Sequence, residues 1–249
     1  MSKRWFQENR RDPWRREARS KGYRARSAYK LKQIQDKFRI IRKGDAVLDV
    51  GCHPGGWTQV VVEEVGFDGL VVGVDLLATS PVEGASIIIG DIGNTSTIDQ
   101  ISEILDGRLL NAVVSDISPK LTGRYDTDQA ISLELSTLVM DAAMTILAPG
   151  GNFVTKIFQG TGIEGLMEAA KQRFSNVQRY APTASRKASS ETYLVCQNKL
   201  PWSKNKTNGI TAFQQVQQHL EKINVLVKNS EEDNIETKIG FKKINKRKE

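Results

Sequence analysis

The chain has 249 residues, of which 39% are hydrophobic and 26% are charged, and its formal net charge is +7. This length allows one large domain or one domain with appendages. No apolar run approaches the roughly 18 residues of a membrane span, and the basic N-terminus lacks the apolar centre of a secretion signal. We therefore expect a cytoplasmic protein with no membrane partner.

The charge is unevenly distributed along the chain. Residues 1–45 carry a net charge of +11, residues 46–198 carry −9 and residues 199–249 carry +5. We expect a basic N-terminal arm with a helix, a central domain, and a basic C-terminal extension that is partly helical or disordered. Four aromatic residues interleave the basic residues of the arm: Trp5, Trp14, Tyr23 and Tyr29. Clustered cations neutralise phosphates and aromatic rings stack on bases, so the arm is a candidate for nucleic-acid binding; a merely solvated arm is the alternative.

Short apolar runs alternate with amphipathic segments, which is typical of βα units around a mostly parallel sheet. In chain order we predict helix 25–37, strand 46–50, helix 57–65, strands 70–75 and 86–90, helix 97–105, strand 111–116, helix 127–147, strand 151–157, helix 164–174, strands 176–180 and 192–197, and helix 211–227. The segment between the last two strands is too short for a crossover helix, so the final strand is expected to run antiparallel. The predicted fold is α/β, a doubly wound and mostly parallel seven-stranded sheet with one antiparallel strand.

A glycine-rich turn follows the first predicted strand, in residues 47–57 (VLDVGCHPGGW). Ligands of open α/β sheets bind at the carboxyl ends of the strands, and Gly51, Gly55 and Gly56 allow a tight turn and a close approach of the backbone to a ligand. Pro54 lies inside the turn, and the glycine spacing departs from the GxGxxG pattern of dinucleotide-binding proteins. A nicotinamide-dependent dehydrogenase is therefore the least favoured alternative.

Carboxylates end the next two predicted strands. Asp75 would accept hydrogen bonds from the hydroxyls of an adenosine ribose, and Asp91 would accept one from the exocyclic amine of adenine. Either acid alone is equally well explained as a helix cap or a turn residue. Together with the glycine turn, they indicate an adenosine-containing ligand.

Two further charges lie at the ends of apolar strands. Asp116 ends the fourth predicted strand, and Lys156 lies within the fifth (FVTKIF). Burying a lysine is unfavourable unless it is paired, so Lys156 has either a function or a structural ion pair with Asp116. The two cysteines and two histidines lack the spacing of metal ligands, and we expect no metal.

From about residue 19 to residue 197 the sequence resembles the FtsJ-like family of RNA 2′-O-ribose methyltransferases, and its ribosomal RNA branch in particular. The matching segments are RSAYKLKQI, LDVGCHPGGWTQVV, VGVDLL, GDI, SDISPKLTG, LAPGGNFVTKIFQG and SRKASSETYLV. The resemblance implies the Rossmann-like fold of the class I S-adenosylmethionine-dependent methyltransferases. It also implies an active-site tetrad of two lysines and two acids: Lys30, Asp116, Lys156 and Glu191. The expected cofactor is S-adenosylmethionine, held by Gly51, Pro54, Gly55, Gly56, Trp57, Asp75, Leu76, Asp91, Ile92 and Asp116.

The resemblance also implies a mechanism in which a ribose hydroxyl approaches the methyl group in line, so that positioning contributes most to the rate. Lys156 is expected to orient the hydroxyl and accept its proton, which requires a neutral amine with a pKa well below the ordinary value of about 10.4. Lys30 would favour that neutral form because like charges disfavour the ammonium. Asp116 and Glu191 would mainly hold the lysines and the donor site in place. The sequence leaves open which lysine loses its proton.

The expected activity is methylation of a uridine in large-subunit (23S) ribosomal RNA. The partner would be ribosomal RNA or the large ribosomal subunit, and a monomer would hold the RNA phosphate backbone with its basic arm. A tRNA ribose 2′-O-methyltransferase would use the same residues and is the first alternative. A non-catalytic RNA-binding ribosome-assembly factor is the second, and the complete tetrad argues against it.

Overall fold

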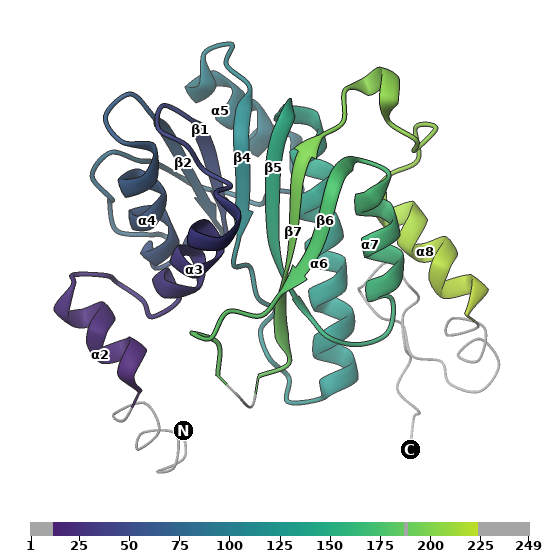
Figure 1. Ribbon diagram of the computed structural model, residues 1–249, viewed down its shortest axis with the longest axis horizontal. Coiled ribbons are helices and arrows are strands. Elements are labelled where there is room, and N and C mark those ends of the chain that lie inside the picture. Colours follow the sequence, from purple (N-terminus) through teal and green to yellow (C-terminus); the bar gives the residue numbers. More distant parts are fainter. Residues whose placement is uncertain (1–11, 187–188, 224–249) are drawn as a thin grey trace.

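The computed structural model describes residues 12–186 and 189–223, which form a single sheet flanked by helices (Figure 1). Its seven strands are β1 (Ala46–Val50), β2 (Leu70–Asp75), β3 (Ser86–Ile89), β4 (Leu110–Ser115), β5 (Leu147–Phe158), β6 (Phe174–Tyr180) and β7 (Glu191–Lys199). The α-helices of the described residues are α2 (Pro13–Ser20), α3 (Ala28–Phe38), α4 (Gly56–Val65), α5 (Thr95–Leu105), α6 (Tyr125–Ile146), α7 (Ile163–Lys171) and α8 (Ala212–Lys222). Across the same residues, no helix combines the length and apolarity that crossing a bilayer requires.

The strands lie in the order β3-β2-β1-β4-β5-β7-β6. Strands β1 to β5 are parallel to one another, whereas β7 runs antiparallel to both β5 and β6. The predicted fold class, with its antiparallel final strand, is confirmed. The strand order reverses between β1 and β4, which is where open α/β sheets bind ligands. Val50 pairs with Ser115 there, so Gly51 and Asp116 leave the sheet side by side.

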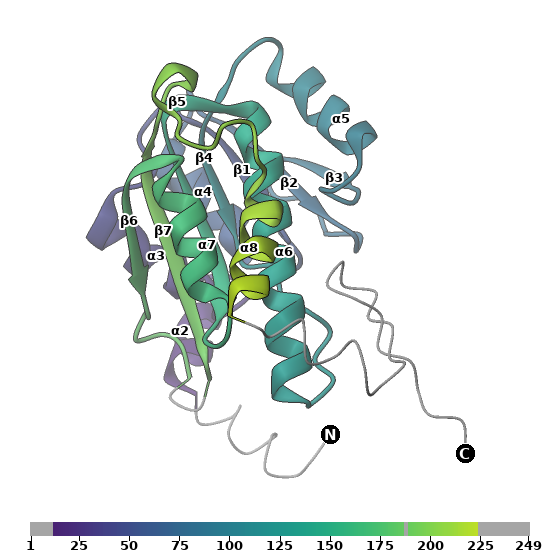
Figure 2. The same cartoon turned by 90° about the vertical axis from the view of Figure 1, so that its right-hand side faces the viewer.

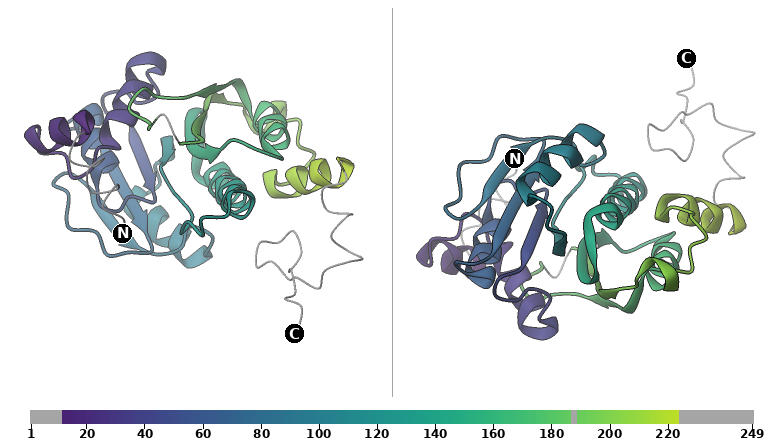
Figure 3. Two further views of the ribbon diagram at one scale, coloured as in Figure 1. Left: turned by 90° about the horizontal axis from the view of Figure 1, so that it is seen from below. Right: turned by 90° about the horizontal axis from the view of Figure 1, so that it is seen from above.

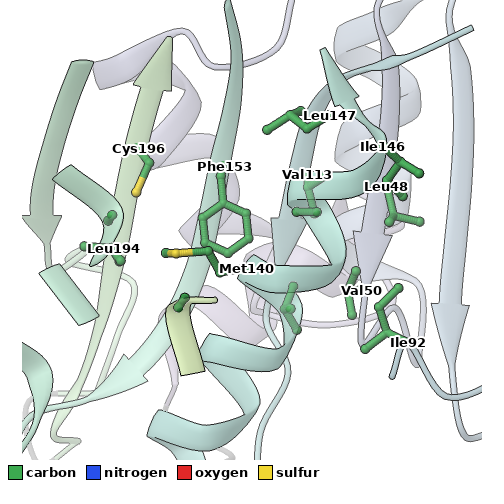
Figure 4. Packing of buried hydrophobic residues seen from close by; sticks show 14 of the residues in the cluster. Leu48, Val50, Ile92, Val113, Met140, Ile146, Leu147, Phe153, Leu194 and Cys196 are labelled. Atoms are coloured by element: carbon green, nitrogen blue, oxygen red, sulfur yellow. The ribbon is translucent and has the colours of Figure 1, made fainter. Parts of the chain in front are cut away.

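Helices cover both faces of the sheet, because alternate residues of the strands point to opposite sides. Leu48 packs with α5, α6 and α7 in one apolar cluster, and its neighbour Val47 packs with α3 and α4 in another. Figure 4 shows side chains of β1, β4, β5 and β7 gathered in the first cluster with Met140 of α6. Figure 3 views the sheet from its two ends and shows α2 and α8 at opposite sides of the molecule.

Two predicted boundaries are wrong. Strand β5 begins at Leu147, directly after α6, because Leu147 pairs with Leu110 and the register then shifts before Asn152. Residues 148–150, which we expected to separate the helix from the strand, are therefore an irregular part of the strand. Phe174 was expected to end a helix but begins β6, because its ring is buried and stacks on Phe153 with centroids 6.1 Å apart.

Helix α2 lies in the basic arm and was not predicted. Asp12 caps it by accepting a hydrogen bond from the Arg15 amide at 3.2 Å. Ala18 is buried in a small cluster with Tyr29, and the Trp14 ring lies 5.1 Å from the Tyr29 ring. Only Trp14 and Ala18 of its eight residues have apolar aliphatic or aromatic side chains besides the proline, so α2 lacks the recurring apolar residues by which a helix is recognised in a sequence.

The C-terminal extension packs on the central domain through α8, which lies against α6 and α7 (Figure 2). Its apolar residues, Ala212, Val216 and Leu220, are buried in the larger apolar cluster. Asp141 of α6 accepts hydrogen bonds from the backbone N–H groups of Ala212 at 2.6 Å and Phe213 at 3.0 Å. The helix predicted over residues 211–227 is thus confirmed as far as Lys222, and residues 224–227 lie outside the described residues.

The interior of β1 carries a buried acid, Asp49, whose side chain faces α4. One carboxyl oxygen accepts a hydrogen bond from the Thr58 hydroxyl at 2.7 Å, and the other has no partner among the described residues. Burial raises the pKa of the Asp49 carboxyl to about 7; the nearby acids Asp116 and Asp75 act in the same direction, and the Thr58 hydroxyl opposes them. Asp49 therefore favours its neutral form in the folded chain.

We predict that Asp49 makes the protein less stable as the pH rises. An unfolded aspartate ionises near pH 4, whereas the folded one keeps its proton until the pH passes about 7. This group should lower the free energy of unfolding by about 2 kcal/mol between pH 5 and pH 7. Urea unfolding at several pH values should show this loss in the wild type and not in Asp49→Asn. The control Asp99→Asn, which changes an exposed residue of α5, should follow the wild-type profile; an identical slope in Asp49→Asn would contradict the prediction.

We also predict that Asp141→Ala loosens the extension. Two N–H groups at the start of α8 would lose a charged acceptor, which should cost about 1–2 kcal/mol of unfolding free energy. Thr211→Ala removes only the hydrogen bond that its hydroxyl accepts from the Gln214 amide and should cost less. The measurement is urea unfolding combined with limited proteolysis near residue 211. Equal stability of Asp141→Ala and the wild type would refute the role of this cap.

Candidate active site

The four residues of the expected tetrad come from four separate elements. Lys30 lies on α3, Asp116 follows β4, Lys156 lies on β5, and Glu191 begins β7. The sheet sets two of these relationships. Ser115 pairs with Thr155, which brings Asp116 beside Lys156, and the antiparallel pairing of Phe158 with Glu191 brings the start of β7 to the same edge.

The structure brings all four side chains together in two ion pairs. Lys156 Nζ lies 3.2 Å from Asp116 Oδ1 and donates a hydrogen bond to the Asp116 backbone carbonyl at 2.8 Å. Lys30 Nζ lies 2.5 Å from Glu191 Oε1. The exposed fractions of the four side chains lie between 7% and 17%, so these are largely buried charges and each ammonium requires its carboxylate.

Tyr193 joins the two ion pairs, and the sequence analysis did not select it. Its hydroxyl donates a hydrogen bond to Asp116 Oδ1 at 2.7 Å, and Lys30 Nζ lies 5.9 Å from the centre of its ring. Burial raises the pKa of the Tyr193 phenol well above its ordinary value, and the Asp116 and Glu191 carboxylates add to the shift. Its place two residues after Glu191, on the opposite strand from Lys156, was the available signal.

The electrostatics of Asp116 favour a carboxylate. Burial by itself would raise the pKa of this carboxyl, but the ammonium groups of Lys156 and Lys30 and the Tyr193 hydroxyl outweigh it and lower the pKa below its ordinary range. A negative charge is thereby fixed next to the amine of Lys156. The arrangement can orient an amine and a hydroxyl group precisely.

A pocket of about 290 Å³ opens beside the Lys30–Glu191 pair. Its walls combine positive, apolar and polar side chains and include Arg26, Ser118, Leu121, Phe158 and Arg186. Leu121 is 64% exposed. Arginines suit a phosphate, and apolar side chains suit the flat face of a base, so the pocket has the chemistry of a nucleotide site.

The glycine turn lies next to this site, at the reversal point of the sheet. Gly51 adopts a φ of 76°, and a Cβ there would lie 3.0 Å from the Ile117 backbone. A Cβ on Gly55 would lie 2.8 Å from the Arg24 guanidinium, and one on Gly56 would lie 3.0 Å from Ala25. We attributed all three glycines to the approach of a ligand; at Gly55 and Gly56 the close neighbour is the N-terminal segment.

The acids of the predicted adenosine site lie at the same edge of the sheet. Asp75 accepts backbone hydrogen bonds from His53 at 2.9 Å and Leu77 at 2.8 Å, and Asp91 accepts one from Gly93 at 2.9 Å. Each carboxylate oxygen has a second lone pair, so both acids can still accept hydrogen bonds from a ligand. These acceptors fit the ribose and the amine of an adenosine.

Of the remaining residues predicted to bind the cofactor, two have exposed side chains and two have buried ones. Pro54 and Leu76 have exposed side chains, and Leu76 offers an apolar surface beside Asp75. The side chains of Ile92 and Trp57 are buried; Trp57 stacks on Tyr193 with ring centres 5.6 Å apart. Trp57 and Ile92 lie in the apolar clusters on opposite faces of the sheet. Within the described residues, no group of three or more His, Cys, Asp or Glu is arranged to hold a metal ion.

Comparison with known proteins gives the family. The model of the FtsJ-like methyltransferase family matches residues 23–199. Ribosomal RNA large subunit methyltransferase E of Methanothrix thermoacetophila is 48% identical over 184 residues, which cover 74% of this chain and 71% of that protein. The protein of the same name from Marinobacter nauticus is 41% identical over 194 residues, 78% of this chain and 94% of that protein.

A solved structure agrees with these relatives. A crystal structure described as a ribosomal RNA methyltransferase from Plasmodium falciparum superposes with a TM-score of 0.66 at 28% identity, covering 72% of this chain and 99% of that one. The family model spans residues 23–199, which include all four residues of the tetrad, and the curated relatives cover about three quarters of the chain. This chain therefore belongs to the FtsJ-like methyltransferase family.

Proposed function

We propose that this chain methylates the ribose 2′-hydroxyl of a uridine in large-subunit (23S) ribosomal RNA, with S-adenosylmethionine as the methyl donor. One observation carries the proposal: two buried ion pairs, from four distant segments, meet between an adenosine-type site and a pocket with nucleotide chemistry. The names of the curated relatives favour ribosomal RNA over tRNA, whose methylation would use the same residues.

The residues at the strand ends fit S-adenosylmethionine. In the proposed complex, Asp75 accepts hydrogen bonds from the ribose hydroxyls, Asp91 accepts one from the adenine amine, and Leu76 contacts the adenine ring. Gly51, Pro54, Gly55 and Gly56 would form the turn beside the methionine part; Trp57 follows this turn in α4, and Ile92 follows Asp91. Bound S-adenosylmethionine supplies an electrophilic methyl group on a positively charged sulfur, and the electron pair of the broken carbon–sulfur bond stays on sulfur.

The tetrad would orient the acceptor hydroxyl and accept its proton. In our proposal Lys156 Nζ, an ammonium in the ion pair with Asp116, first gives up a proton to solvent. The neutral amine then holds the 2′-hydroxyl and takes its proton as the oxygen bonds to the methyl carbon. Asp116 fixes that amine through the contacts described above and stabilises the ammonium that forms. Lys30, held by Glu191, lines the pocket and orients the ribose. Alignment of the oxygen with the methyl group is the main contribution to the rate.

The basic arm supplies the affinity for RNA in this proposal. Four basic residues lie exposed in or directly after α2: Arg15, Arg16, Arg19 and Lys21. Cations spaced along one helix neutralise successive phosphates and release counterions. We retain the division into the arm (residues 1–45), the methyltransferase core (46–198) and the extension (199–249), and we propose that the enzyme acts as a cytoplasmic monomer.

Lys156→Ala should abolish methyl transfer without unfolding the protein. Loss of a positioned proton acceptor lowers rates by about 100-fold or more. The assay is transfer of labelled methyl from S-adenosylmethionine to large-subunit RNA, with circular dichroism and calorimetry to check the fold and cofactor binding. Lys171→Ala, which changes an exposed lysine of α7, is the control and should keep wild-type turnover. Near wild-type turnover in Lys156→Ala would show that the role given to Lys156 is wrong.

The RNA substrate can be identified by mapping 2′-O-methyl groups in total RNA from cells with and without the gene. We expect one uridine methyl to disappear from large-subunit ribosomal RNA, and the purified protein to restore it. Loss of a methyl from a tRNA instead would favour the tRNA alternative. Failure to bind S-adenosylmethionine at millimolar concentration would favour the non-catalytic assembly factor.

A further inference from the structure

The segment that joins α2 to α3 is fixed to α4. Gln59 donates a hydrogen bond to the Gly22 carbonyl at 3.0 Å and accepts one from the Arg24 amide at 2.9 Å. The Tyr23 hydroxyl donates to Glu63 at 2.6 Å and accepts from Lys32 at 2.8 Å. Arg24 therefore extends from a backbone that is held on both sides.

The guanidinium of Arg24 joins two loops by donating to three backbone carbonyls. One acceptor is Pro54, in the glycine turn, at 3.3 Å. The other two, Ser80 at 2.6 Å and Pro81 at 2.5 Å, lie in the loop between β2 and β3. A planar guanidinium presents several N–H donors in fixed directions, and the single amine of a lysine cannot reproduce that fork.

These two loops frame the proposed site of the methyl donor. The first is the glycine turn, and the second begins directly after Asp75. The His53 amide already connects them by its hydrogen bond to Asp75, and the Thr79 hydroxyl lies 3.3 Å from His53 Nδ1. Arg24 connects the same two loops through its guanidinium. That group occupies space that a side chain on Gly55 would fill.

We infer that Arg24 is a positioning residue for the methyl-donor site, which it holds in shape by tying the glycine turn to the β2–β3 loop. The inference rests on the proposed function, because it assumes that this site binds S-adenosylmethionine. The inference gives Arg24, a basic residue of the arm, a role in cofactor binding rather than in binding RNA phosphates. The role depends on the geometry of the guanidinium, not on its charge alone.

The test compares Arg24→Lys and Arg24→Ala with the wild type. Calorimetry should show S-adenosylmethionine binding weakened about tenfold or more in both variants, the effect of losing about one charge-assisted hydrogen bond. In steady-state assays the KM for S-adenosylmethionine should rise by a similar factor, while kcat at saturating cofactor stays within about twofold. Hydrogen exchange in the absence of cofactor should be faster in residues 52–56 and 76–82.

Arg19→Ala provides the contrast, since it changes an exposed arginine of α2. It should leave the affinity for S-adenosylmethionine unchanged, raise the KM for RNA and reduce the salt dependence of that KM. Rescue of cofactor binding by Arg24→Lys would indicate a role of charge and overturn the inference, as would wild-type affinity in Arg24→Ala. If an Arg24 variant unfolds, Gln59→Ala is the second test, because it frees the segment that carries Arg24. This variant should weaken cofactor binding to a smaller degree than loss of Arg24. Unchanged cofactor binding in Gln59→Ala would also overturn the inference. A wild type that binds no S-adenosylmethionine would instead remove the proposed function itself.

Discussion

The pairing of buried charges is the constraint on which the rest of this structure depends. Two ammonium groups and two carboxylates lie largely out of water, and each would be costly to bury alone. Their partners are on different elements, so the ion pairs form only when α3 is seated on the sheet and β7 is inserted beside β5. The fold and the chemistry of the site therefore depend on the same arrangement. The contacts that pair these charges also hold the Lys156 amine in position to bind a hydroxyl group.

The basic arm is structurally part of the site. It contributes Lys30 directly, and the segment before α3 fills the space behind Gly55 and Gly56. The loop between β6 and β7 is held against the same arm, since the Gln33 side chain accepts hydrogen bonds from Thr183 and Ala184. The arm contacts both the loops of the proposed donor site, through Arg24, and the pocket beside Lys30, so RNA bound along α2 would act on a segment that joins the two.

Much of the architecture could be predicted from the sequence, because buried strands ending in glycine or acid follow from local patterns. The seven-stranded α/β sheet and the antiparallel β7 belong to this group, whereas the order of the strands was not predicted. Lys30 and Glu191 could be selected only through the family resemblance, since no local pattern marks a charge whose partner is distant in the chain. Tyr193 was missed for the same reason. Helix α2 was missed because Ala18 is its buried residue and gives no repeated apolar pattern. The start of β5 was misjudged because proline and glycine usually end a strand, and here the pairing of Leu147 overrides them.

The long-range contacts of the arm have a consequence for synthesis of the protein. Arg26 and the Ala184 carbonyl to which it donates a hydrogen bond are 158 positions apart. Domains form as the chain leaves the ribosome from its N-terminus, and contacts between distant residues wait for the later one. The arm is made first and finds partners early in α4 and the glycine turn, but Arg26 and Lys30 acquire Ala184 and Glu191 almost last. A nascent chain that stops before β7 therefore carries its cationic arm without Glu191 and Tyr193, and the network of charges around Lys30 and Asp116 cannot close until β7 has been made.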